Sequence, residues 1–170
     1  MTMRCKYFLS RRVLAVIIFT AGFCLCGISA LAADPVLAHR LNQEAVDLAQ
    51  TGDYQQAYRK ITKAWEAGAG GEVIRDNRIE IGRSLASEYM EQGRHQQAID
   101  LLEDLRRLGG PRGESVEKQL AVALNNYAVA FFKKGDYITA ENYFTRASGM
   151  AYQTGADSLY QQINEVFSQL

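Results

Sequence analysis

Apolar residues recur every three or four positions along most of the chain after residue 34, which is the spacing of one face of an α-helix. This pattern is interrupted three times by a glycine and a polar residue, at Gly52-Asp53, Gly93-Arg94 and Gly135-Asp136. Glycine adopts the left-handed backbone that ends a helix without a steric penalty, and aspartate caps the next helix by accepting a backbone N–H. The pattern therefore predicts three pairs of antiparallel helices, each joined by a tight turn.

The stretch from Asn125 to Ala147 carries the clearest copy of this unit. Leu124, Tyr127, Ala128 and Phe131 share one face of its first helix, and Ala140, Phe144 and Ala147 share one face of its second. The same offsets from the turn glycine give equivalent second-helix positions in the other units. These are Ala57, Ile61 and Ala64 in unit one, and Ala98, Leu102 and Leu105 in unit two.

This arrangement resembles the tetratricopeptide repeat, a helix-turn-helix unit of about 34 residues. The resemblance implies an all-α fold, a right-handed α-solenoid of three helix-turn-helix repeats. The turn glycines Gly52, Gly93 and Gly135 are 41 and 42 residues apart. We therefore expect longer first helices in units two and three, starting near Glu72 and Ser115. The expected units cover about residues 34–67, 72–108 and 114–149.

The last segment predicts one more helix, at about residues 157–170. Its apolar stripe consists of Leu159, Tyr160, Ile163, Val166, Phe167 and Leu170, and its opposite side is polar. A stack of repeats needs an end helix of this kind to shield its final core. We expect a capping helix, and a docking helix for another protein is the alternative.

The first 32 residues have the layout of a secretory signal peptide. Four basic residues precede an apolar run from Val13 to Ile28, and Ala30-Leu31-Ala32 follows as a small-x-small cleavage site. The sequence therefore predicts cleavage after Ala32, a repeat domain at 33–170 and a periplasmic or secreted protein. The alternative is an uncleaved inner-membrane anchor with the repeats outside the cytoplasm, because the apolar run is almost long enough to span a bilayer.

Charge and cysteine content narrow the function classes. All three cysteines, Cys5, Cys24 and Cys26, precede the predicted cut, so the mature chain would need no disulfides. The 19 basic and 19 acidic residues balance, and losing four basic residues with the signal leaves 15 against 19. A mildly acidic domain argues against a nucleic-acid partner, which requires a basic face. Membrane contact is expected only through an uncleaved N-terminal segment.

Residues suited to catalysis are sparse. His39 and His95 lie in different units without a neighbouring cluster of potential metal ligands. The glycine-rich segment 109–113 lacks the Lys-Ser/Thr ending of a phosphate-binding loop and no strand precedes it, so it predicts a loop between repeats. His95 occupies the place of a tyrosine in the other turns and is predicted to be a packing residue. We expect no enzyme activity, no metal and no cofactor.

A peptide-binding groove is the site that the resemblance implies, because the first helices of such repeats line a concave surface. The predicted groove residues are Asn42, Val46, Glu80, Arg83, Ser87, Met90, Val122, Asn125, Asn126, Val129 and Phe132, with His39 and Ala49 beside them. Asn42, Arg83 and Asn125 occupy the same position in successive units. A planar guanidinium between two side-chain amides can bind a peptide backbone or a carboxylate through hydrogen bonds.

Two further features bear on the partner. Asn126 matches one asparagine of the clamp with which some members grip a carboxy-terminal peptide, but the lysines of that clamp are absent at the matching places. Val122, Val129 and Phe132 form an apolar stripe that predicts a partner surface, a contact with the final helix, or a homodimer.

The sequence thus predicts a non-enzymatic protein–protein interaction module, an adaptor or assembly factor that binds a peptide or protein segment in its concave groove. The alternative is a membrane-tethered scaffold that organises an inner-membrane complex through an uncleaved anchor.

Overall fold

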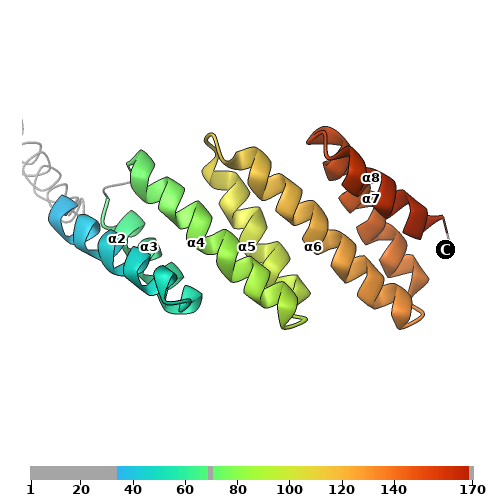
Figure 1. Ribbon diagram of the computed structural model, residues 1–170, viewed down its shortest axis with the longest axis horizontal. Coiled ribbons are helices and arrows are strands. Elements are labelled where there is room, and N and C mark those ends of the chain that lie inside the picture. The colour runs from blue at the N-terminus through green and yellow to red at the C-terminus, as the bar shows by residue number, and fades with distance from the viewer. Residues whose placement is uncertain (1–33, 69–70, 169–170) are drawn as a thin grey trace, which may run out of the picture. The chain divides into compact units, whose positions relative to one another are not determined.

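The computed structural model describes residues 34–68 and 71–168, so the predicted signal peptide, its cleavage site and the three cysteines lie outside the described residues. Within these two ranges every regular element is an α-helix (Figure 1). The helices are α2 (Pro35–Gln50), α3 (Tyr54–Glu66), α4 (Glu72–Glu91), α5 (His95–Leu108), α6 (Gly113–Lys133), α7 (Tyr137–Gln153) and α8 (Asp157–Phe167). The predicted all-α fold is confirmed. No helix in this part of the chain is both long and apolar enough to cross a bilayer.

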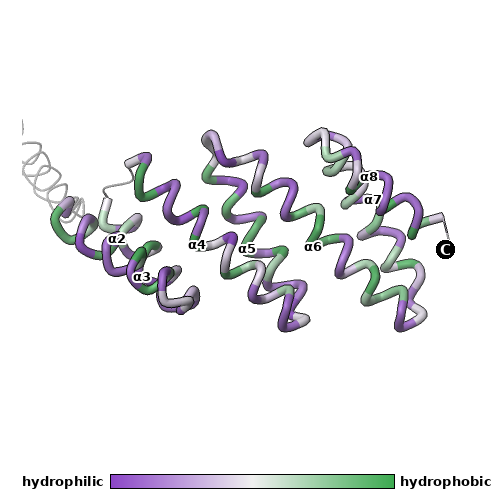
Figure 2. The backbone as a smooth tube through the Cα atoms, in the orientation of Figure 1, coloured by the Kyte–Doolittle hydropathy of each residue, from purple (hydrophilic) through white to green (hydrophobic). Residues whose placement is uncertain are grey.

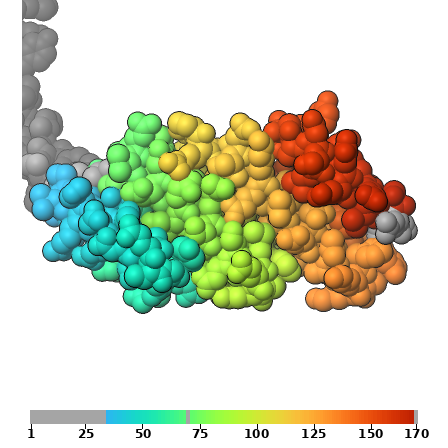
Figure 3. All heavy atoms as spheres, in the orientation of Figure 1, coloured from blue at the N-terminus to red at the C-terminus, as the bar shows by residue number. Residues whose placement is uncertain are grey.

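The helices form a stack of hairpins in chain order. Helices that follow one another in the chain pack together, and α4 also contacts the first helices of the neighbouring units, α2 and α6. The second helices, α3, α5 and α7, lie behind this layer in the view of Figure 1. The units follow one another from the α2–α3 hairpin to α8 in the space-filling view (Figure 3). The structure therefore confirms the predicted stack of helix-turn-helix units.

The three predicted turns share one geometry. Gly52, Gly93 and Gly135 have φ of 83°, 72° and 79°, the left-handed values that glycine tolerates best. In the third turn the Gly135 N–H donates to the carbonyl of Phe132, and the next N–H donates to the carbonyl of Phe131 (2.9 and 3.1 Å). These bonds satisfy carbonyls that the end of the helix leaves unpaired.

Aspartate caps the second helix in units one and three, as predicted. Asp53 Oδ1 accepts the Gln56 N–H at 3.0 Å, and Asp136 Oδ1 accepts the Thr139 N–H at 3.1 Å. Arg94 stands in this position in unit two, and its side chain provides no cap. Its guanidinium instead lies over the Tyr89 ring, 4.1 Å from the centroid. The second helix of unit two thus lacks a stabilising bond that typically contributes about 1 kcal/mol.

The predicted inward faces form the core. All nine second-helix positions aligned on the turns are at most 1% exposed, and Phe144 is the largest of them. Apolar and polar residues alternate along the helices, as the hydropathy tube shows (Figure 2). His95, predicted to be a packing residue, lies against the Tyr127 ring, with the ring centroids 5.7 Å apart and the planes tilted by 33°. Burial lowers the pKa of His95, and the nearby Lys134 lowers this pKa further, so the imidazole is neutral at neutral pH.

The C-terminal part differs from the sequence prediction in two places. Helix α6 begins at Gly113, before the predicted start near Ser115, and α7 continues to Gln153, beyond the expected end near residue 149. A fourth turn with the same bonding then follows. Gly155 has φ of 61°, and the Ala156 N–H donates to the carbonyl of Ala151 at 2.9 Å. No capping aspartate marks this turn in the sequence, because Ala156 stands at the position that Asp53 and Asp136 occupy in units one and three.

Helix α8 covers part of unit three. Ile163 is fully buried, the Phe167 ring lies 6.0 Å from the Phe144 ring, and Ser148 Oγ donates to Asn164 Oδ1 at 3.0 Å. Ile163 and Phe167 of the predicted apolar stripe therefore pack toward α7, as expected for a helix that covers the end of a core, whereas Leu170 of that stripe lies outside the described residues.

Candidate functional site

Successive first helices are joined by a contact that recurs at equivalent positions. Asn77 Nδ2 donates to Asn42 Oδ1 at 2.9 Å, and Arg83 Nε donates to Gln119 Oε1 at 3.0 Å. Asn42 and Arg83 each lie ten residues before a turn glycine, and Asn77 and Gln119 each lie sixteen residues before the following one. Two of the predicted groove positions therefore bind the next repeat. Asn42 is only 7% exposed.

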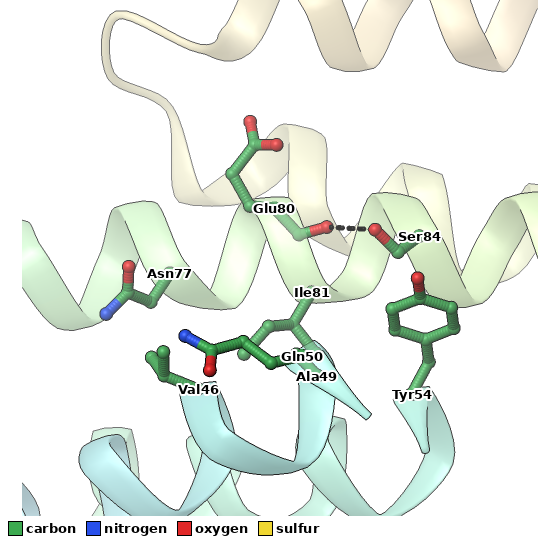
Figure 4. Close-up of a pocket in the computed structure, with 8 residues that line it drawn as sticks. All are labelled: Val46, Ala49, Gln50, Tyr54, Asn77, Glu80, Ile81 and Ser84. Atoms are coloured by element: carbon green, nitrogen blue, oxygen red, sulfur yellow. Dashed lines mark hydrogen bonds between the residues drawn. The ribbon is translucent and has the colours of Figure 1, made fainter. Parts of the chain in front are cut away.

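Arg83 belongs to a polar network between α4 and α6. Gln119 Nε2 donates to the backbone carbonyl of Arg83 and to Ser87 Oγ, both at 2.9 Å. Glu80 Oε1 accepts from Arg83 Nη1 at 3.1 Å and from Arg112 Nη1 at 2.5 Å. The Glu80 carboxylate points away from α2 (Figure 4), so its charge is compensated within the repeat stack. The Arg83 side chain, predicted to contact a peptide, thus bonds Glu80 and Gln119 within the chain.

A shallow trough runs between α2 and α4 on this layer. It consists of two hollows that share Tyr54 and Ser84, and a third hollow toward α6 continues it through Ser84 and Ser87. We call this surface the α2–α4 trough, and it is lined by Val46, Ala49, Gln50, Gly52, Tyr54, Asn77, Glu80, Ile81, Ser84, Ser87, Glu88 and Glu91.

The trough combines aliphatic surface with accessible polar groups. Figure 4 shows the Gln50 amide and the Tyr54 hydroxyl directed into the space between the two helices. Ser84 Oγ donates to the Glu80 backbone carbonyl at 3.2 Å. Among the described residues, no lysine and no arginine lines the two hollows between α2 and α4, whereas Glu88 and Glu91 line the second of them. The surface can therefore bind an extended segment through hydrogen bonds and can accept a positive charge near the Gly52 end.

The other predicted groove residues lie elsewhere. Val46 and Ser87 line the trough with Glu80, but Met90, Val129 and Phe132 pack partly buried against the main core. Val122 and Asn126 are half-buried on α6, and Asn125 Oδ1 is buried without a hydrogen-bond partner among the described residues. His39 lies in a separate hollow near the start of α2. The structure thus places only part of the predicted set in the trough, and the other members lie in contacts between repeats, against the core, on α6 or in a separate hollow.

Sequence reasoning missed several trough residues: Gln50, Tyr54, Ser84, Glu88 and Glu91. Tyr54 opens the second helix of unit one, so a map of first helices alone could not include it. Glu88 and Glu91 directly follow the predicted Ser87 and Met90, and an assignment shifted by one residue would have found them. Among the described residues, no group of three or more His, Cys, Asp or Glu side chains is placed to hold a metal ion.

The comparisons with known proteins agree with the hairpin geometry. The family model described as the tetratricopeptide repeat matches residues 124–146, which contain the end of α6, the Gly135 turn and the first part of α7. No curated protein sequence matches the chain. Repeats of the matched kind are typically non-catalytic modules that bind other proteins, and the matched segment is therefore similar to a protein–protein interaction module.

Proposed function

We propose that this protein is a non-enzymatic adaptor or assembly factor that binds a peptide, or an extended segment of a protein partner, in the α2–α4 trough. The observation that carries the proposal is the trough itself, where Gln50 and Tyr54 direct polar groups into a concavity beside aliphatic surface. The tetratricopeptide match supports a protein partner. An extended segment fits because its unpaired backbone amides and carbonyls can bond these side chains.

The charge of the trough favours a neutral or basic segment. Glu88 and Glu91 line the hollow near the turn at Gly52, and no cationic side chain from residues 34–68 or 71–168 lines it. A lysine or arginine of the ligand would pair with these carboxylates. Such a contact at the rim of an interface contributes more to specificity and association rate than to affinity.

Peptides selected from a displayed random library against the full chain test this proposal. Ser84 lies where the hollows meet, so Ser84→Arg fills the trough and should weaken binding of the selected peptides by about tenfold or more. Ser158→Arg is the matched control, because Ser158 is exposed on α8. Both variants should melt within a few degrees of wild type, as expected for surface substitutions. Selection of no peptide, or equal binding by both variants, would contradict the proposal.

We also propose that residues 1–32 are removed on export, so that the adaptor acts in the periplasm or outside the cell. The basic residues, apolar run and small-x-small site at the N-terminus support this proposal. The intact mass of the protein purified from its native compartment should correspond to a chain beginning at Ala33. A full-length mass in the membrane fraction would instead favour the membrane-tethered scaffold.

A further inference from the structure

The first hollow of the α2–α4 trough lies beside a residue that is unusually small for its place in the repeat. Ala49 lines this hollow and lies three residues before Gly52. The residues at the same distance from the turn glycines of units two and three are Met90 and Phe132. All three pack partly buried against a core. Unit one therefore has a methyl group where the other units have a large apolar side chain.

Aliphatic side chains surround the space beyond the Ala49 methyl group. Figure 4 places Val46 and Ala49 on α2 and Ile81 opposite them on α4. Ile81 is only 5% exposed, so it belongs to the floor of the hollow. An apolar side chain that entered this space would lose contact with water, which stabilises a complex in proportion to the apolar area buried.

The second hollow differs in chemistry and lies further along α4. It is lined by Glu88 and Glu91. Ile81 and Glu88 are seven residues apart in this helix, which corresponds to about 10 Å along its axis. An extended chain advances about 3.3 Å per residue, so this distance equals about three residues of a bound segment. The long side chain of a lysine or arginine can also reach the carboxylates from two residues away.

We propose that the trough binds an extended segment of a partner protein through two side chains. The first is an apolar side chain of the size of methionine or leucine, which enters the hollow beside Ala49 and takes the place that Met90 fills in unit two. The second is a lysine or arginine two or three residues away, which pairs with Glu88 and Glu91. This inference rests on the proposed function, because it specifies the segment that the adaptor binds.

Ala49→Met tests the first hollow, because it supplies from the chain itself the side chain that the ligand is proposed to provide. Peptides selected from the displayed random library against the full wild-type chain should share a methionine or leucine at one position. In fluorescence anisotropy, labelled copies of these peptides should bind Ala49→Met about tenfold more weakly than wild type. Copies with alanine at the shared position should bind both proteins equally weakly.

Gly149→Met is the matched control for this substitution. It adds the same side chain to an exposed position of α7, where no atom lies within 4 Å of an added Cβ. The control should bind the selected peptides as wild type does. Thermal melting by circular dichroism should show that both variants are folded, because methionine is a good helix former.

The second hollow is tested by a double variant, Glu88→Gln with Glu91→Gln, which removes both charges and nearly preserves side-chain size. This variant should bind the selected peptides about threefold more weakly at low salt, and the difference should shrink at high salt because ions screen exposed charges. Peptides with glutamine in place of the basic residue should bind this variant and wild type equally.

Two results would overturn this inference and leave the adaptor proposal intact. Ser84→Arg would block the selected peptides although they share no apolar position, or the peptides would bind Ala49→Met as tightly as wild type. Selection of no peptide, or binding that Ser84→Arg does not change, would refute the adaptor proposal and this inference with it. A concentration-dependent dimer that Ala49→Met abolishes would assign the hollow to a second copy and would also refute the inference.

Discussion

Phe144→Ala is expected to lower the free energy of unfolding by about 3–5 kcal/mol, the usual cost of deleting a buried phenylalanine. Phe144 is the largest fully buried side chain of the core and is completely inaccessible to solvent. Its ring lies against Phe167 of α8, with centroids 6.0 Å apart. Alanine would leave a cavity between α7 and α8 that the surrounding helices can close only in part. The substitution should therefore destabilise unit three and loosen α8 together.

Urea unfolding can check this expectation with two probes. Circular dichroism reports all helices, whereas the single tryptophan, Trp65 in α3, reports unit one. Because repeat units interact mainly with their neighbours, Phe144→Ala should shift the circular dichroism transition more than the Trp65 fluorescence transition. Tyr152→Ala is the control, since Tyr152 is on the same helix but 72% exposed. A Phe144→Ala variant as stable as this control would show that the core of unit three is packed differently.

Gly82→Leu is expected to destabilise the protein by roughly 2–3 kcal/mol through overpacking. Gly82 is buried in α4, where a Cβ atom would lie 2.7 Å from Leu105 Cδ1 and 2.9 Å from Tyr58 Cε2. Leucine has the better helix propensity by about 1 kcal/mol, so propensity alone predicts a gain in stability. The close approach of α3 and α5 to this side of α4 makes the packing effect dominate.

Gly149→Leu is the matched control for this prediction. Gly149 lies in α7, is exposed, and has no atom within 4 Å of the position of an added Cβ. This substitution should leave stability unchanged or raise it by about 1 kcal/mol. Thermal melting of both variants distinguishes packing from propensity. If Gly82→Leu melts at or above the temperature of Gly149→Leu, the helices do not approach at Gly82 as closely as the structure shows.

The hairpins could be predicted because their signals are local. Gly52, Gly93 and Gly135 adopt a backbone conformation that few other residues tolerate, and Asp53 and Asp136 cap the helices that follow. The alanine five residues after each of these glycines is buried in all three units. The Gly155 turn was missed because Ala156 replaces the capping residue and no aligned alanine follows it.

The site was predicted less well because two neighbouring faces of a helix are offset by only one residue in the sequence. Asn42 and Arg83 were placed in an open groove, yet both contact the next first helix. The angle at which α2, α4 and α6 meet decides which stripe is covered, and that angle depends on side chains from several units at once. Asn125 illustrates the same point, because its Oδ1 atom, placed in the groove from the sequence, is buried within the chain.

By itself, the sequence determined the turns, the caps, the buried face of each second helix and hence the class of fold. These features depend on backbone preference and on the 3.6-residue period, which act within one helix or one turn. Only the tertiary structure decided which polar residues join the repeats and where the trough lies between α2 and α4. Those properties arise where helices from different units meet, and no spacing within a single unit encodes them.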